Sequence, residues 1–176
     1  MFVVLMFTIP LLYPYGSFTG LDGWANSFDS ANKVAFADPI SRIVYGIGDV
    51  MCHQQEARSP IVNGSQMAFC HRDIGIFIGF AIGLILTFDR GFLTYVRKKG
   101  LTAHRRSFKS IWDRISYLRI PLIGVMLSTV TVIEWAIEYT TPLDAPLLRV
   151  ITGILSGFGI AMILQWIVSK WYLDTY

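Results

Sequence analysis

Long apolar stretches alternate with shorter polar segments along the chain. Three of these stretches approach the roughly 20 residues that a helix needs to cross a hydrocarbon core of about 30 Å. They lie at residues 71–88, 120–139 and 147–171. The pattern therefore predicts three transmembrane helices.

The opening run, residues 1–15, is also apolar, but it is short and contains Pro10. It fits a signal peptide, a clipped span or a tilted membrane helix. We expect a retained span, because the run has neither a basic n-region nor a small-residue cleavage site. The predicted fold is thus an all-α polytopic helix bundle with about four transmembrane helices, forming a single membrane domain over residues 1–176.

The segment between the first two expected spans, residues 16–70, is more polar. Its first part, residues 16–39, is rich in Gly, Ser, Asn and Asp, as is typical of a loop. The Asp38-Pro39 pair then favours a helix start, and residues 41–51 are expected to form a short helix near the membrane surface. The sequence therefore predicts an external loop that carries a short interfacial helix.

Composition excludes an ordinary soluble protein, because 53% of residues are hydrophobic, 15% are charged and the mean hydropathy is +0.51. The net charge of +3 does not indicate nucleic acid binding, since nine of the fifteen Lys and Arg residues fall between Arg90 and Arg119. By the positive-inside rule, this basic loop, residues 89–119, is cytoplasmic, residues 16–70 are external and both termini are cytoplasmic. Besides the lipid bilayer itself, anionic headgroups are candidate partners of the basic loop.

Glycines recur at every fourth residue in two of the expected spans. Such spacing places a strip of glycine along one helix face, where two backbones can approach closely. We expect packing inside the bundle, and the alternative is docking on the helix of a partner subunit. The glycines concerned are Gly75, Gly79, Gly83, Gly153 and Gly157.

Two Cys-His pairs, Cys52-His53 and Cys70-His71, flank the region just before the second expected span. In an external loop the cysteines could form a disulfide worth about 2–4 kcal/mol. A second interpretation is a zinc or copper site built from Cys52, Cys70, one or both histidines and Asp73. A third is that the residues are separate and inert. No Ser-His-Asp order, phosphate loop or dinucleotide fingerprint is visible in the sequence.

Charged residues also occur at the expected outer ends of the spans. Glu134 and Glu138 share one helix face, while Arg72 and Arg149 stand near the starts of two other spans. Charges within spans usually face partners or water. Together with Asp73 they predict either an ion-paired clamp that fastens the bundle or a polar pocket for a metal or headgroup.

Several of these residues form a pattern that resembles a known family. The run includes Cys52-His53-Gln54, Arg58-Ser59, Gly64, Gln66, Cys70, Arg72-Asp73, Gly75-Ile76 and Gly79, followed later by Leu148-Arg149, Ile151-Thr152-Gly153 and Gly157. It resembles the small predicted membrane proteins of archaea and bacteria labelled domain of unknown function 2085. The resemblance covers roughly residues 49–159.

This resemblance implies a cluster of two cysteines with a third cysteine or, here, Asp73, which slightly strengthens the metal interpretation relative to a plain disulfide. The chain departs from the family pattern at His71, where a small residue is usual, and at Glu134-Trp135, where Asp-Gly is usual. The family carries no established reaction.

Two functions from different classes follow. The first is a non-catalytic accessory subunit of a larger membrane complex, for example of respiratory or monooxygenase type, whose glycine faces dock other membrane subunits. The second is a small membrane-embedded metal-binding or redox enzyme acting at the outer leaflet. Asn63-Gly64-Ser65 matches a glycosylation sequon, so modification of Asn63 would report an external loop.

Overall fold

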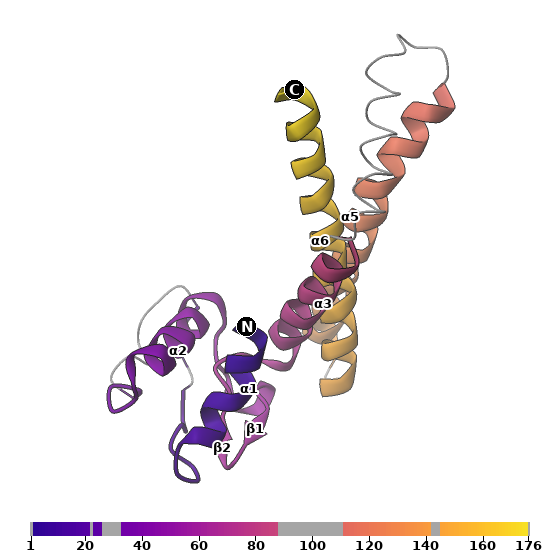
Figure 1. The fold of residues 1–176 in the computed structure, drawn as a ribbon. Coiled ribbons are helices and arrows are strands. Elements are labelled where there is room, and N and C mark those ends of the chain that lie inside the picture. The colour runs from indigo at the N-terminus through magenta and orange to yellow at the C-terminus, as the bar shows by residue number, and fades with distance from the viewer. Residues whose placement is uncertain (1, 22, 26–32, 88–110, 142–144, 176) are drawn as a thin grey trace. The chain divides into compact units, whose positions relative to one another are not determined.

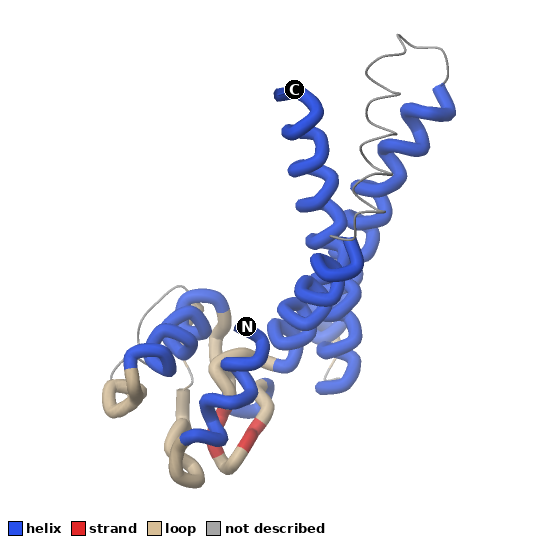
Figure 2. The backbone as a smooth tube through the Cα atoms, viewed as in Figure 1, coloured by secondary structure: helices blue, strands red, loops and turns tan. Residues whose placement is uncertain are grey.

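A computed structural model describes residues 2–21, 23–25, 33–87, 111–141 and 145–175 (Figure 1). These residues are mostly helical, in agreement with the predicted class, but a short hairpin of two strands departs from an all-α fold (Figure 2). The elements are α1 (Phe2–Leu12), α2 (Pro39–Met51), a 3-10 turn (Glu56–Arg58), β1 (Ile61–Val62), β2 (Ser65–Gln66), α3 (His71–Thr87), α5 (Ile111–Thr140) and α6 (Pro146–Thr175).

The chain divides into two compact units. The first comprises Met1–Ile74 and Ala145–Val150, and the second comprises Gly75–Asp144 and Ile151–Tyr176. The sequence had predicted a single membrane domain with residues 16–70 as an external loop. Within the first unit, part of this segment forms α2, the 3-10 turn and the hairpin.

Helix α1 is too short for the span expected at residues 1–15. Its 11 residues extend ~16 Å at about 1.5 Å per residue, whereas a hydrocarbon core is about 30 Å thick. Met6, Ile9 and Pro10 are buried, and the helix contacts both α2 and β1. The Asn63 side-chain amide donates hydrogen bonds to the carbonyls of Pro10 (3.2 Å) and Tyr13 (2.9 Å), which holds the end of α1 within the first unit.

Among the described residues, two helices are long and apolar enough to cross a membrane. They are Arg119–Thr140 within α5 and Pro146–Val168 within α6. Helix α3 has 17 residues and coincides with the expected span 71–88, except that residue 88 lies outside the described residues. The predicted count of four spans is therefore not supported. Helix α5 begins at Ile111, inside the expected basic loop, and residues 89–110 of that loop lie outside the described residues.

The predicted start of the second helix at Asp38-Pro39 is confirmed. Asp38 is the N-cap of α2, and its carboxylate accepts hydrogen bonds from the backbone N–H groups of Ile40 (2.8 Å) and Ser41 (3.2 Å). The hydroxyls of Ser41 and Tyr13 also donate to this carboxylate. These hydrogen bonds lower the pKa of Asp38 well below its usual value, so the start of α2 and the chain after α1 are tied to one anionic group.

Two residues with left-handed backbone close the hairpin. Asn63 (φ 51°) and Gly64 (φ 67°) connect β1 to β2 in an antiparallel register that pairs Val62 with Ser65. A two-residue Asn-Gly loop with both φ angles positive is the type I′ turn that best fits the twist of a hairpin. The sequence signal for this turn was present in the Asn63-Gly64 pair.

Aromatic side chains fill the core of the first unit. Phe18 stacks on Tyr45 with ring centroids 4.4 Å apart and meets Tyr13 edge to face at 4.9 Å. The Tyr45 hydroxyl donates to the carbonyl of Gln66 at 2.8 Å, which links α2 to the hairpin. This core fixes α2 and the chain that leads into α3, the two elements that carry the cysteines.

In the second unit, glycines allow close contact between helices. A Cβ atom at Gly79 of α3 would lie 2.0 Å from the carbonyl oxygen of Ile154 in α6, and one at Gly157 would lie 2.0 Å from that of Ile76. Gly83 faces α6 in the same way, and Gly75 and Gly153 are buried.

Helices α5 and α6 meet through small residues that lie outside the glycine pattern of the sequence. Gly124 and Gly159 lie against each other's backbone, and the Ser156 hydroxyl donates to the carbonyl of Ser128 at 3.1 Å. Serine pairs of this kind provide interhelical hydrogen bonds where water is absent.

Candidate metal centre

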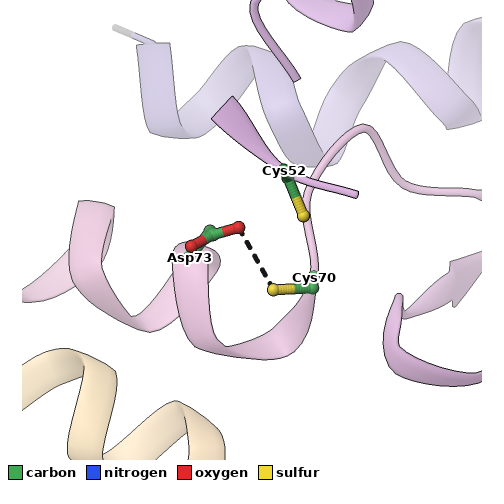
Figure 3. Close-up of side chains that lie close together, drawn as sticks. All are labelled: Cys52, Cys70 and Asp73. Atoms are coloured by element: carbon green, nitrogen blue, oxygen red, sulfur yellow. Dashed lines mark hydrogen bonds between the residues drawn. The ribbon is translucent and has the colours of Figure 1, made fainter. Parts of the chain in front are cut away.

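Three potential metal ligands converge in the first unit. Cys52 follows the last residue of α2, Cys70 immediately precedes α3, and Asp73 lies in the first turn of α3. The two sulfur atoms and a carboxylate oxygen lie within 4.8 Å of one another (Figure 3). The Cys70 thiol donates a hydrogen bond to Asp73 Oδ2 at 3.1 Å. The cluster therefore combines thiol and carboxylate donors at the start of an apolar helix.

Local backbone structure brings these side chains together. The N–H of Cys52 donates to the carbonyl of Gly48 at 2.7 Å and its backbone is then extended, which ends α2 at this position. The carbonyl of Cys70 accepts from the N–H of Ile74 at 3.0 Å and so opens α3. A residue three positions into a helix can reach back to the residue before its start, and Asp73 does so toward Cys70.

Two buried glutamines hold the segment after Cys52 against the segment before Cys70. Gln54, with φ 47°, donates through Nε2 to the carbonyls of Tyr45 (3.1 Å) and Ala68 (3.2 Å). Gln66 donates through Nε2 to the carbonyl of Gln54, and its Oε1 accepts from the N–H of Leu21 at 3.0 Å. Replacement of either glutamine by an apolar residue would remove hydrogen bonds from buried backbone groups.

The environment of Cys52 disfavours a negative charge in the absence of a cation. The side chain is buried, and the pKa of its thiol is raised by its hydrogen bond with Cys70, by desolvation and by the charge of Asp73. A bound divalent cation reverses these effects, because it stabilises a thiolate and the neighbouring carboxylate together. The site is thus suited to a group that brings positive charge.

The two histidines of the Cys-His pairs lie outside this cluster. His53 is exposed, and its Nδ1 accepts a hydrogen bond from the N–H of Ala25 at 3.1 Å. His71 Nδ1 lies 2.6 Å from the carbonyl oxygen of Arg58, to which it must donate. Adjacent residues on the chain point in different directions here, so the structure places Cys52, Cys70 and Asp73 together without either histidine.

Both cysteines are free thiols in this structure. A disulfide needs sulfur atoms about 2 Å apart, while the ligand atoms of the cluster lie within 4.8 Å of one another. The arrangement can therefore bind a metal, and oxidation with small side-chain movements would convert it to a disulfide.

The charged residues expected at the outer ends of the spans are divided between the two units. Glu134 and Arg149 are each buried, and Glu138 and Arg72 are each half-buried. The glutamates belong to the second unit and the arginines to the first. The predicted ion pairs between them stay a prediction.

The glycosylation sequon has a structural role. The Asn63 amide is engaged with the end of α1, and Ser65 is fully buried, with its Oγ accepting from the N–H of Phe18 at 3.4 Å. Modification of Asn63 would break these contacts, so glycosylation is a poor reporter of topology for the folded protein.

Comparison with known proteins gives one family. A family model described as "Predicted membrane protein (DUF2085)" matches residues 52–163, a range that includes Cys52, Cys70 and Asp73. A stretch of 47 residues is 38% identical to an uncharacterized protein of Methanocaldococcus jannaschii, and the match covers 27% of this chain and 30% of that protein. No solved structure matches. Since the family model covers more than half of the chain, the protein belongs to the DUF2085 family of predicted membrane proteins.

Proposed function

We propose that this membrane protein binds one transition-metal ion, zinc in the first instance, through Cys52 Sγ, Cys70 Sγ and the carboxylate of Asp73. The observation that carries the proposal is that these three ligand atoms lie within 4.8 Å of one another. Thiolate and carboxylate are both common zinc ligands. Copper(I) prefers sulfur-only sites, so the carboxylate favours zinc.

The geometry is close to what zinc requires. With Zn–S bonds of about 2.3 Å in a tetrahedral site, two sulfur ligands lie ~3.8 Å apart. A separation of at most 4.8 Å can close to that value by small side-chain rotations. Three donors converge among the described residues, which leaves one coordination position for water or an external ligand.

The side of the membrane on which this site lies follows from charge. The positive-inside rule places the basic loop, residues 89–119, in the cytoplasm and the start of α3 on the outer side. Because α1 is too short to span, we favour three crossings, formed by α3, α5 and α6, over the four expected from the sequence. The N-terminal unit would then be external and the C-terminus cytoplasmic.

Metal content measured beside thiol content tests the proposal. Full-length protein purified in mild detergent is expected to carry about one zinc per chain, by analogy with mononuclear zinc sites. Cys52→Ser and Cys70→Ser should each lose the metal, and Asp73→Asn should weaken its binding. His53→Ala is the matched control, because this histidine neighbours Cys52 but lies outside the cluster.

The opposite results are equally clear. A Cys52–Cys70 disulfide with no bound metal would overturn the metal site in favour of a structural cross-link. Metal that survives in the variant with both cysteines replaced would place it elsewhere in the chain.

A non-catalytic accessory subunit is the second candidate. The surface that such a subunit would offer to a neighbour is the exposed apolar face of α5, including Val132, Ile133 and Trp135. Such a face suits either lipid or the helix of another subunit. Purification from native membranes distinguishes a subunit from a solitary protein, since a subunit would carry other chains in constant proportion and a solitary protein would not.

A further inference from the structure

Helix α2 exposes an apolar stripe, while its buried face is a mixture of polar and apolar residues. Its buried residues are Ser41, Val44, Tyr45, Gly48 and Asp49. Ile40, Ile43 and Met51 are exposed, Ile43 by 61%. With half-buried Ile47 they recur every three or four residues and form one stripe. A surface helix of a soluble protein presents charged and polar residues at such exposed positions.

Specific contacts fix α2 in this orientation. The Ser41 hydroxyl accepts a hydrogen bond from the Tyr13 hydroxyl at 3.4 Å, and the Tyr45 hydroxyl donates to the carbonyl of Gln66. Gly48 lies so close to the chain that a Cβ atom there would be 2.2 Å from the carbonyl oxygen of Ala68. Rotation of α2 to bury its isoleucines would break all three contacts, so the outward stripe is a fixed property of the first unit.

Helix α1 adds a second apolar face. It contains no charged residue, and its hydroxyl-bearing residue, Thr8, donates to the carbonyl of Val4 at 3.0 Å. One side of the helix is buried in the first unit, while Val4, Leu11 and Leu12 are exposed, Leu12 by 75%. The two helices contact each other within the unit.

We propose that these faces of α1 and α2 rest in the interfacial layer of the lipid bilayer and anchor the first unit to the membrane surface. The first unit contains the first residues of both α3 and α6, so the chain connects it directly to two apolar helices. Short helices with an apolar face bind in the plane of the interface.

Polar and aromatic residues next to the two faces are also of the kinds found at the lipid headgroup layer. Tyr15, just after α1, is 83% exposed, and Trp24 is exposed as well. Tyrosine and tryptophan are enriched at the level of lipid headgroups. Arg42 is exposed next to the stripe on α2, where its guanidinium can reach a phosphate while its stem covers apolar surface. This anchor does not depend on a bound metal and stands apart from the proposed function.

Photolabelling of the full-length protein in nanodiscs tests the anchor. The probe is a phosphatidylcholine with a diazirine on its acyl chain, and the labelled peptides are located by mass spectrometry. We expect labels on the peptides of α1 and α2 well above the level on the β1–β2 hairpin. Ile43→Asp should lower labelling of the α2 peptide about tenfold, the loss expected when one exposed isoleucine no longer enters lipid.

Ile61→Asp is the matched control, because Ile61 is a similarly exposed isoleucine on β1. It should leave labelling of α2 unchanged. Labelling of α1 and α2 no higher than that of the hairpin in the wild-type protein would overturn the proposal. Cross-links from these faces to another protein, or to a second copy of the chain, in place of lipid would overturn it as well.

Discussion

Gln54 and Gln66, two buried polar residues between the cysteines, have a structural role. Their amides satisfy backbone groups of the loop and fix the separation of Cys52 from Cys70. The sequence identified Cys52, Cys70 and Asp73 as candidate ligands, but it also included both histidines. It could not exclude them, because the direction of each ring depends on distant partners, the N–H of Ala25 and the carbonyl of Arg58.

Replacing Gln66 should destabilise the first unit. In Gln66→Ala, the N–H of Leu21 and the carbonyl of Gln54 lose a partner inside the core, at a cost of about 1–3 kcal/mol for each buried group left unsatisfied. Thermal unfolding followed by near-ultraviolet circular dichroism reports on the aromatic core of this unit. Gln55→Ala, which removes an exposed amide from the neighbouring position, should leave the transition unchanged, and an equal shift in both variants would contradict the role of the network.

Asp38 should make the first unit sensitive to acid. Hydrogen bonds from Ser41 and Tyr13 hold its pKa below the usual value, which is about 4 in an unfolded chain. The carboxylate therefore stabilises the folded state above that pH, and this contribution is lost as the pH falls toward the folded-state pKa. Asp38→Asn keeps a capping oxygen but removes the charge.

The stability difference between wild type and Asp38→Asn should thus be largest near neutral pH and shrink below about pH 4. Unfolding measured across this range checks the prediction. Tyr13→Phe removes one of the donors and should give an intermediate dependence. A difference that grows with acid would show that Asp38 is not held in its charged form.

Among the helices, the sequence predicted those features that depend on neighbouring residues alone, namely a helix start and the length of apolar runs. Asp38-Pro39 marked the start of α2, and apolar length marked α5 and α6. Hydropathy marked residues 1–15 as a span, whereas α1 has 11 residues and Asn63 binds its end to the hairpin, a long-range contact that hydropathy does not report. The hairpin itself was missed because Asn63-Gly64 was interpreted as part of a glycosylation sequon rather than as a type I′ turn.

Close packing of α3 against α6 should be sensitive to one added methyl group. In Gly157→Ala the new Cβ atom would lie 2.0 Å from the carbonyl oxygen of Ile76, so the helices must move apart, at a cost of about 1–3 kcal/mol for overpacking. Unfolding of the purified protein by titration with a denaturing detergent measures this loss. Leu155→Ala, on an exposed position of the same helix, is the control, and a larger effect there would contradict glycine-mediated packing.

At the scale of the whole molecule, the chain combines an N-terminal unit with a unit built from apolar helices. Composition predicted a membrane protein, and membership of the DUF2085 family of predicted membrane proteins agrees with it. The folded nature of the N-terminal unit was not predictable from hydropathy, since its stability rests on contacts between distant residues, such as Phe18 with Tyr45 and Leu21 with Gln66. This unit positions the candidate metal site where the chain enters α3.

The most direct test of the metal site is X-ray absorption at the zinc edge on the full-length protein loaded with one equivalent of zinc. We expect two sulfur neighbours at about 2.3 Å and oxygen or nitrogen neighbours at about 2.0–2.2 Å, with the sulfur contribution lost when Cys52 and Cys70 are both replaced by serine. A zinc ion surrounded only by nitrogen and oxygen, or protein that retains no zinc while both thiols remain reduced, would contradict it.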